Sequence, residues 1–192
     1  MKELPLPQTK GEMSLEQAIE QRRSVRSFRP HALSDRDLSQ LLWAAQGITD
    51  TSRKLRAAPS AGATYPLETY VVTADAIYRY DVDKHALRAV EKGDHRPALA
   101  RAALGQGCVR TAPAIIVFTA VPARTTVRYG NRGLRYIHME AGHSAQNVHL
   151  QAAALGLGSV PVGAFDDERV SEVLGCSGKE EPLYIVPVGV PR

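Results

Sequence analysis

Four arginines stand within one short stretch of the sequence, QRRSVRSFRP at positions 21–30. They are Arg22, Arg23, Arg26 and Arg29, and Ser24 adds a hydroxyl donor among them. Guanidinium groups stay charged and bind phosphate through paired hydrogen bonds. If the preceding helix continues, Arg22, Arg26 and Arg29 share one of its faces. From the residues alone, an anion site and a solvated helix end that favours the helix dipole are equally good interpretations.

Two further segments are rich in glycine, proline and small residues. APSAGATYP at 58–66 forms a tight backbone whose amides can reach the edge of a flat ligand, although taken alone an ordinary loop before a strand is the better interpretation. GLGSVPVGAF at 156–165 carries half of a dinucleotide fingerprint, but it leads from a helix into a strand, which excludes a Rossmann site. Gly163 and Ala164 can be backbone close to a ligand. The alternative is a helix C-cap at Gly156 followed by a core strand.

The remaining polar residues give little sign of acid, base or metal chemistry. His138, His143 and His149 are spaced five and six apart, which does not place two ligands on one helix face, so we expect polar or interface contacts. Glu140 and Asn147 are expected to satisfy buried backbone groups. Neither a GxSxG nor a P-loop pattern occurs in the sequence. This combination suits an enzyme whose cofactor supplies the chemistry.

The composition predicts one globular domain over residues 1–192. The chain is 44% hydrophobic and 23% charged, and no window approaches the roughly 18 apolar residues that span a bilayer. Residues 1–14 lack the apolar core of a secretory signal, and Cys108 and Cys176 form no CxxC pattern, so a reducing cytoplasm is expected. The net charge of +4 fits an anionic ligand, whereas the 6% of aromatic residues and the dispersed basic residues disfavour nucleic acid.

The hydrophobic patterns predict an α+β domain with interleaved helices and strands. Helices are expected at 14–23, 34–47, 96–107, 134–155 and 166–175, and strands at 69–74, 76–83, 114–121 and 182–190. Ala74 and Asp75 form the turn of a hairpin, and 156–165 reads as a strand and a turn.

The longest predicted helix, 134–155, is apolar almost all round. Along one face the spacing alternates between four and three residues, and most side chains there are small. Small side chains allow another helix to approach closely. We therefore expect this helix to pack on the core on one side and on a partner chain on the other.

Four of these segments, in order, resemble the flavin-dependent nitroreductase family. They are RRSVRSF at 22–28, PSAGATYPLETYVV at 59–72, RYIHMEAGHSAQNVHLQAAALGLGSVPVGAF at 135–165 and EEPLYIVPVGVP at 180–191. The resemblance covers nearly the whole chain. The forms PSAGA-x-YPLE and EAGH-x-AQN are most similar to the branch that contains the azoline (thiazole- and oxazole-forming) oxidases. Ala63, Tyr65 and Leu67 replace the Asn, Gln and Trp of the commoner family pattern.

The resemblance implies a nitroreductase-like sandwich, a mainly antiparallel sheet flanked by helices, in an intertwined homodimer with FMN at the interface. The residues that match the flavin-binding motif near the first helix are Arg22, Arg23, Ser24 and Arg26. Those that match the second motif, contributed by the partner chain, are Pro59, Ser60, Ala61, Gly62 and Ala63. Those that match the segment along the flavin ring near N5 are Pro161, Val162, Gly163 and Ala164. Arg192 matches a basic residue that reaches the phosphate, while Arg29 remains a surface charge.

The resemblance also implies a ping-pong oxidoreductase. NADH or NADPH gives hydride to flavin N5, and a nitroaromatic, quinone or similar small acceptor then takes two electrons. The protein supplies positioning and positive charge near flavin N1 and C2, from Arg22 or Arg26, and no catalytic side chain. The residues 122–135 are expected near the substrate opening.

Two other interpretations of the resemblance stay open. One is an azoline dehydrogenase, for which Arg135–Tyr136 stands where that branch has a Lys–Tyr pair. The other is a flavin-binding module without turnover. A further interpretation belongs to a different functional class: a nucleic-acid-binding protein that uses the arginine cluster.

Overall fold

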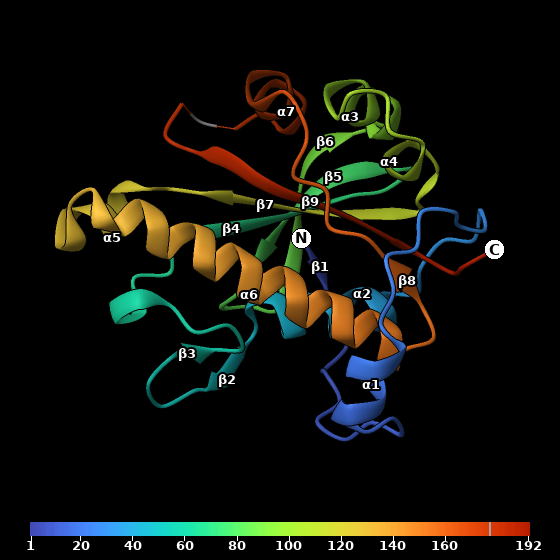
Figure 1. Ribbon diagram of the computed structural model, residues 1–192, viewed down its shortest axis with the longest axis horizontal. Helices are drawn as coiled ribbons and strands as arrows, with labels where there is room; N and C mark the ends of the chain where they lie inside the picture. Colours follow the sequence, from blue (N-terminus) through green and yellow to red (C-terminus); the bar gives the residue numbers. More distant parts are fainter. Residues whose placement is uncertain (177) are drawn as a thin grey trace.

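In the computed structural model, which describes residues 1–176 and 178–192, seven strands form one antiparallel sheet in the order β1-β6-β5-β4-β7-β9-β8 (Figure 1). The strands are β1 (Lys2–Glu3), β4 (Leu67–Val72), β5 (Ala76–Asp81), β6 (Ala86–Lys92), β7 (Ala114–Ala120), β8 (Gly158–Ser159) and β9 (Glu181–Gly189). A separate hairpin pairs β2 (Ile48–Asp50) with β3 (Leu55–Arg56). The predicted α+β class with a mainly antiparallel sheet is confirmed.

Helices cover both faces of this sheet. They are α1 (Leu15–Gln21), α2 (Asp35–Gln46), α3 (Arg96–Ala102), α4 (Gly107–Thr111), α5 (Ala123–Tyr129), α6 (Arg132–Ala154) and α7 (Asp167–Leu174), with a 3-10 turn, η1 (Ala61–Ala63). Figure 1 shows α6 in the foreground below the sheet, with α1 and α2 beside it, and α3, α4 and α7 above the sheet.

The central strand β7 packs against both layers of helices, one on each of its faces. All seven of its residues are buried, and alternate side chains of a strand point to opposite faces. Ile115 and Val117 pack in the cluster that includes side chains of α3, α4 and α7. Ile116 and Phe118 pack in the cluster that includes side chains of α2 and α6. The continuous apolar run predicted as a buried strand therefore anchors two cores.

Local sequence signals fix where the first helices begin. Ser14 accepts a hydrogen bond from the amide of Gln17, and the Gln17 side chain accepts from the amide of Ser14. Ser34 and Asp37 form the same reciprocal capping box at the start of α2. Both predicted helix starts are confirmed.

The helix predicted over 14–23 ends before the arginines. The helix ends at Gln21, and Arg22 is its C-cap with non-helical backbone angles (φ −54°, ψ 123°). Ser24 then pairs with Ser159, and Phe28, which is buried in the core, pairs with Pro191. The helical face that would join Arg22, Arg26 and Arg29 therefore does not form.

Several elements were not predicted from the sequence. Strand β6 has no alternating pattern of buried and exposed residues, since only its first two residues, Ala86 and Leu87, are buried. The helix expected at 96–107 stops at Ala102, because Leu104 and Gly105 adopt positive φ (57° and 75°), and α4 begins separately. The segment 122–135 forms α5 and the first turn of α6. None of the described helices is both long and apolar enough to cross a membrane.

Candidate functional site

The extended segment 22–28 lies against β8 and the chain that follows it. The Val25 amide donates to the Ser159 carbonyl (3.0 Å). A Cβ on Gly158 would lie 2.6 Å from the Val25 Cβ, so only glycine permits this approach. The structure thus places segment 22–26 against residues 158–159, and Val25 packs against the core cluster that contains Val162 of the predicted segment 161–164.

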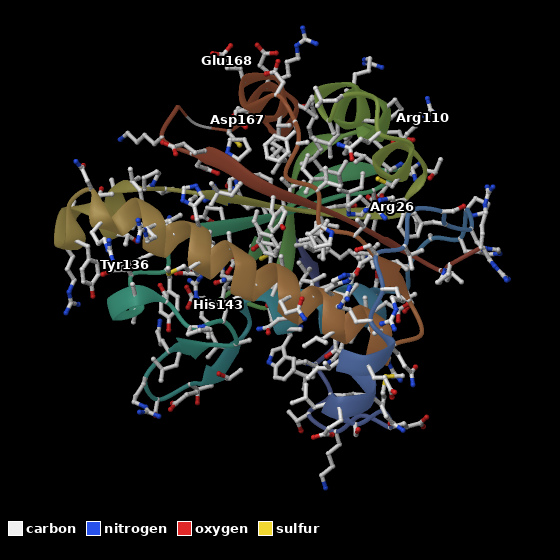
Figure 2. All side chains as sticks on the ribbon, viewed as in Figure 1. Arg26, Arg110, Tyr136, His143, Asp167 and Glu168 are labelled. Carbon is white, nitrogen blue, oxygen red and sulfur yellow. The ribbon has the colours of Figure 1, made fainter. Side chains whose placement is uncertain are left out.

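Arg26 presents an exposed cation beside this junction. Its guanidinium makes no ion pair or hydrogen bond with any described residue. It lines a cavity of about 420 Å³ together with Ser27, Gln106, Gly107, Cys108 and Thr111. Figure 2 shows Arg26 below Arg110 of α4. An unpaired guanidinium at the rim of a cavity is suited to an anionic ligand.

Gly163 and Ala164 expose free backbone donors nearby. Both residues are exposed, and their amides find no acceptor within residues 1–176 and 178–192. Val162 instead faces inward and exchanges hydrogen bonds with Ile185 (2.7 and 3.0 Å), which anchors the segment to β9. The Ala164 carbonyl accepts from the Gln106 side chain (2.9 Å). Half-buried Pro161 precedes this anchor.

Arg22 is half-buried and held by a histidine that the sequence analysis left without a specific role. The Arg22 Nη1 group donates to His149 Nε2 (2.9 Å), and His149 Nδ1 lies 2.6 Å from Ser159 Oγ. Burial, together with the nearby Arg22 charge, lowers the pKa of His149 to about 4. The polar contact expected for this histidine is confirmed.

Arg23 and Arg192 lie beside the junction, but their side chains donate hydrogen bonds to backbone carbonyls. Arg23 donates to the carbonyls of Glu20 and Arg22 (2.6 and 2.8 Å), so it closes the end of α1. The Arg192 amide donates to the Ser27 carbonyl, and its Nε donates to the Phe28 carbonyl (2.9 Å). Arg192 lines a neighbouring cavity of about 500 Å³ rather than the one that Arg26 lines.

The predicted segment Pro59–Ala63 lies apart from this junction, near the N-terminal half of α6. Figure 1 places its short turn below α5, whereas α1 and β8 lie near the other end of α6. Gly62, Ala63 and Tyr65 have positive φ (59°, 53° and 45°). A Cβ on Gly62 would lie 2.5 Å from the Tyr129 hydroxyl. Backbone in this region costs free energy for residues other than glycine, and such strain concentrates at functional sites.

Helix α5 supports this strained turn, which the sequence analysis did not foresee. The hydroxyls of Thr125 and Thr64 lie 2.8 Å apart, and Thr64 also donates to the Ala61 carbonyl. Arg124 donates to the Tyr65 carbonyl (3.1 Å) and pairs with Glu68. The segment 122–135 therefore contacts the second predicted flavin segment directly.

Glu140 departs from its expected role. Its side chain is buried (2% exposed) and lies near Ser60 and Arg56, and its Oε1 has no partner in the part of the chain that the structure describes. Burial raises the pKa of Glu140 to about 7, and Ser60 and Arg56 oppose that rise. The expectation that Glu140 satisfies buried backbone is therefore wrong, because Oε1 has no partner and no backbone amide of the described residues donates to this carboxylate.

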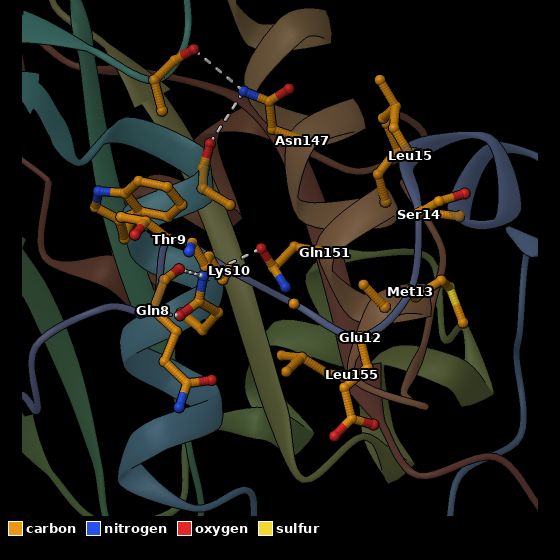
Figure 3. A pocket seen from close by; sticks show the side chains of 18 residues that line it. Gln8, Thr9, Lys10, Glu12, Met13, Ser14, Leu15, Asn147, Gln151 and Leu155 are labelled. Atoms are coloured by element: carbon orange, nitrogen blue, oxygen red, sulfur yellow. Dashed lines mark hydrogen bonds between the residues drawn. The ribbon is translucent and has the colours of Figure 1, made fainter.

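Asn147 does satisfy buried backbone, as expected. Its Nδ2 donates to the carbonyls of Ala44 (3.0 Å) and Ala57 (3.5 Å), as the dashed lines in Figure 3 show. It borders a cavity of about 790 Å³ between the N-terminal arm, α2 and the C-terminal half of α6. None of the predicted flavin-binding residues lines this cavity.

The predicted site residues thus form two groups near opposite ends of α6. One offers the Arg22 and Arg26 guanidinium groups and the free amides of Gly163 and Ala164; the other is a strained turn. Cations combined with open amides fit a ligand that carries a phosphate and a flat hydrogen-bonding edge. Among the described residues, no three His, Cys, Asp or Glu side chains gather as metal ligands.

The sequence matches known proteins over almost its full length. The family model described as "Nitroreductase family" matches residues 19–190. A nitroreductase-like protein of Methanocaldococcus jannaschii is 45% identical over 193 residues, which cover 97% of this chain and 96% of the relative.

Solved structures share the fold. A nitroreductase-like protein of Ralstonia eutropha JMP134 superposes with a TM-score of 0.91 at 30% identity, over 100% of this chain and 89% of that one. A nitroreductase-like protein of Anabaena variabilis superposes with a TM-score of 0.82 at 32% identity, over 93% of this chain and 38% of that chain. A chain of the E. coli microcin synthetase complex McbBCD with truncated pro-MccB17 superposes with a TM-score of 0.78 at 24% identity, over 89% of this chain and 70% of that one. This likeness shows a shared fold.

Proposed function

Because the chain belongs to the nitroreductase family, we propose that this oxidoreductase depends on FMN and passes a hydride from NADH or NADPH to a nitroaromatic, a quinone or a similar small acceptor. The observation that carries the proposal is the position of two distant segments around Gln106, which lines the cavity of Arg26 and donates to the Ala164 carbonyl. Segment 22–26 brings an unpaired guanidinium, and segment 161–164 brings two free amides.

The residues present fit FMN. Bound FMN would supply hydride acceptance and donation at N5. Arg22 and Arg26 would hold its anionic phosphate or the electron-rich edge of its ring, because guanidinium groups stay charged at every working pH. Gly163 and Ala164 would donate from their amides to the ring edge, while Val162 keeps the segment fixed to β9.

A homodimer would complete each site. Segment 59–63 lies near the other end of α6 from segment 22–26, so a flavin held by both requires segment 59–63 of a second chain. Large apolar side chains stay exposed along α1 and α6: Leu15 (62%), Ile19 (55%) and Met139 (52%). Exposed apolar residues gathered on neighbouring helices suit a protein interface. The free thiols of Cys108 and Cys176 suit a reducing compartment, so we place the enzyme in the cytoplasm.

The second candidate is an azoline dehydrogenase, which the motif forms PSAGA-x-YPLE and EAGH-x-AQN favour. At the expected position of the Lys–Tyr pair this chain has Arg135 and Tyr136, and the Tyr136 ring packs edge-on against Tyr129 (5.3 Å). An arginine stays protonated in proteins, so Arg135 cannot act as a base. This makes azoline oxidation the weaker candidate.

The test is reconstitution of the purified protein with FMN, followed by anaerobic addition of NADH or NADPH and then of an acceptor. We expect the yellow colour to bleach with one pyridine nucleotide and to return with a quinone or nitroaromatic, but not with an azoline peptide. Bound flavin that neither nucleotide bleaches would identify a passive binding module. A protein that binds no FMN would contradict the proposal.

The arginine assignment has its own prediction. The double variant Arg22→Ala, Arg26→Ala should lose FMN affinity by at least ~100-fold, because two charge-assisted contacts disappear. Arg29→Ala is the matched control, since Arg29 belongs to the same stretch but donates to the Pro191 carbonyl instead. Titration of flavin fluorescence measures both. Full flavin retention in the double variant would rule out this role for Arg22 and Arg26.

A further inference from the structure

We propose that His149 is a positioning residue that orients the Arg22 guanidinium toward the anionic part of the flavin without neutralising its charge. This inference rests on the proposed function. It concerns a buried side chain of α6 that the sequence comparison with flavin-binding motifs does not include.

The hydrogen bonds around His149 determine which ring nitrogen carries the proton. A guanidinium can only donate, so His149 Nε2, 2.9 Å from Arg22 Nη1, must be the unprotonated acceptor. The proton of the neutral ring then lies on Nδ1, which donates to Ser159 Oγ at 2.6 Å. His149 is 4% exposed, so this arrangement is shielded from water. The ring thereby links the end of α1 to β8.

Electrostatics keep the ring neutral. Arg22, at the end of α1, is the charged group that faces His149, and Ser159 of β8 is its polar neighbour. Burial and the Arg22 charge both disfavour an imidazolium, which lowers the pKa of His149. The acceptor of Arg22 therefore stays in its accepting form throughout the neutral range.

A neutral acceptor has a consequence that a carboxylate would not have. An Asp or Glu at this position would form an ion pair with Arg22 and cancel its charge toward a ligand. The neutral imidazole fixes one Nη group and leaves the positive charge available. No described residue forms a salt bridge with Arg22, which agrees with a cation kept for an external anion.

The first test compares substitutions at His149 by FMN titration of the apoprotein at pH 7. His149→Gln offers a neutral carbonyl oxygen to Arg22 and should bind FMN within about 3-fold of wild type. His149→Leu removes the acceptor and should bind about 10-fold more weakly. His149→Glu, nearly the same shape as Gln, should also bind about 10-fold more weakly because it neutralises Arg22. Equal affinity of the Gln and Glu variants, or of the Leu variant and wild type, would overturn the inference.

A matched control comes from the N-terminal part of the fold. His85 is also hydrogen-bonded on both ring nitrogens, to Tyr80 (2.7 Å) and to Ser39 (2.7 Å). His85→Leu should lower stability but leave FMN affinity unchanged. An equal loss of affinity in His85→Leu and His149→Leu would mean that lost stability, rather than lost orientation, weakens binding, and this would overturn the inference.

The second test needs no flavin and no variant. Nitrogen NMR of the wild-type apoprotein should show His149 with a protonated Nδ1 and a bare Nε2 at pH 7. A ring protonated on Nε2 would overturn the inference even if FMN binds. Failure of the wild type to bind FMN would instead contradict the proposed function and the inference together, so the two failures are distinguishable.

Discussion

At the scale of single residues, buried Glu140 should make the stability of the protein depend on pH. Its pKa is about 7 in the folded protein, above its ordinary value of 4.5, so folding favours the protonated form. The stability that this preference contributes is present below about pH 4.5 and is lost as the pH rises through 7. Glu140→Gln cannot ionise, and we expect it to be more stable than wild type by ~1–3 kcal/mol at pH 8.

Urea unfolding at pH 5 and pH 8 measures this difference. The gain should shrink toward pH 5, where Glu140 is protonated. Glu12→Gln, at an exposed position, is the control and should change little at either pH. A gain for Glu140→Gln that is equal at both pH values would show that burial of the charge is not its cause.

At the scale of secondary-structure elements, α5 should hold the strained turn at 61–64 in place. Thr125 is buried, and in this geometry its hydroxyl donates to the Thr64 hydroxyl, which donates onward to the Ala61 carbonyl. Thr125→Val keeps the shape and removes the donor, which should cost about 1 kcal/mol. We expect faster amide hydrogen exchange at residues 61–64 and little change in the sheet.

The comparison variant is Thr111→Val, which removes a hydroxyl that donates to the Gly107 carbonyl within α4. It should leave exchange at 61–64 unchanged. Unaltered exchange in Thr125→Val would show that the turn is stable without α5.

At the scale of the whole molecule, the separation of the two site halves predicts that each flavin is shared between chains. One chain carries Arg22→Ala and Arg26→Ala; the other carries Gly62→Val, which strains a residue at φ 59°. Each variant alone should form dimers without flavin. A mixed dimer has one intact site and one site that carries both sets of substitutions. Random co-assembly makes about half of the dimers mixed, so roughly a quarter of the wild-type flavin content should be recovered.

Flavin absorbance per chain after co-expression measures this recovery, and sizing of each variant confirms that dimers persist. No recovery in demonstrated mixed dimers would place both halves of a site in the same chain. Full recovery would mean that one of the two segments is dispensable.

Local interactions made much of this fold predictable from the sequence. The capping boxes at Ser14 and Ser34 work within one helical turn, and the apolar run of β7 needs only burial to become a strand. The candidate site could be anticipated in part because its segments resemble family motifs. The sequence shows Gly158 and Gly62, but it does not show the close contacts with Val25 and Tyr129 that require glycine at these positions.

Tertiary structure alone decided the rest, because the deciding partners lie far apart in the chain. Helix α1 ends at Gln21 since the following residues pair with Ser159 and bury Phe28, and no local signal encodes either event. Arg22 finds its acceptor 127 residues away at His149. The sequence by itself determined the α+β class, the long helix and the residue types at the site. Only packing across the sheet decided that the two groups of predicted site residues lie near opposite ends of α6.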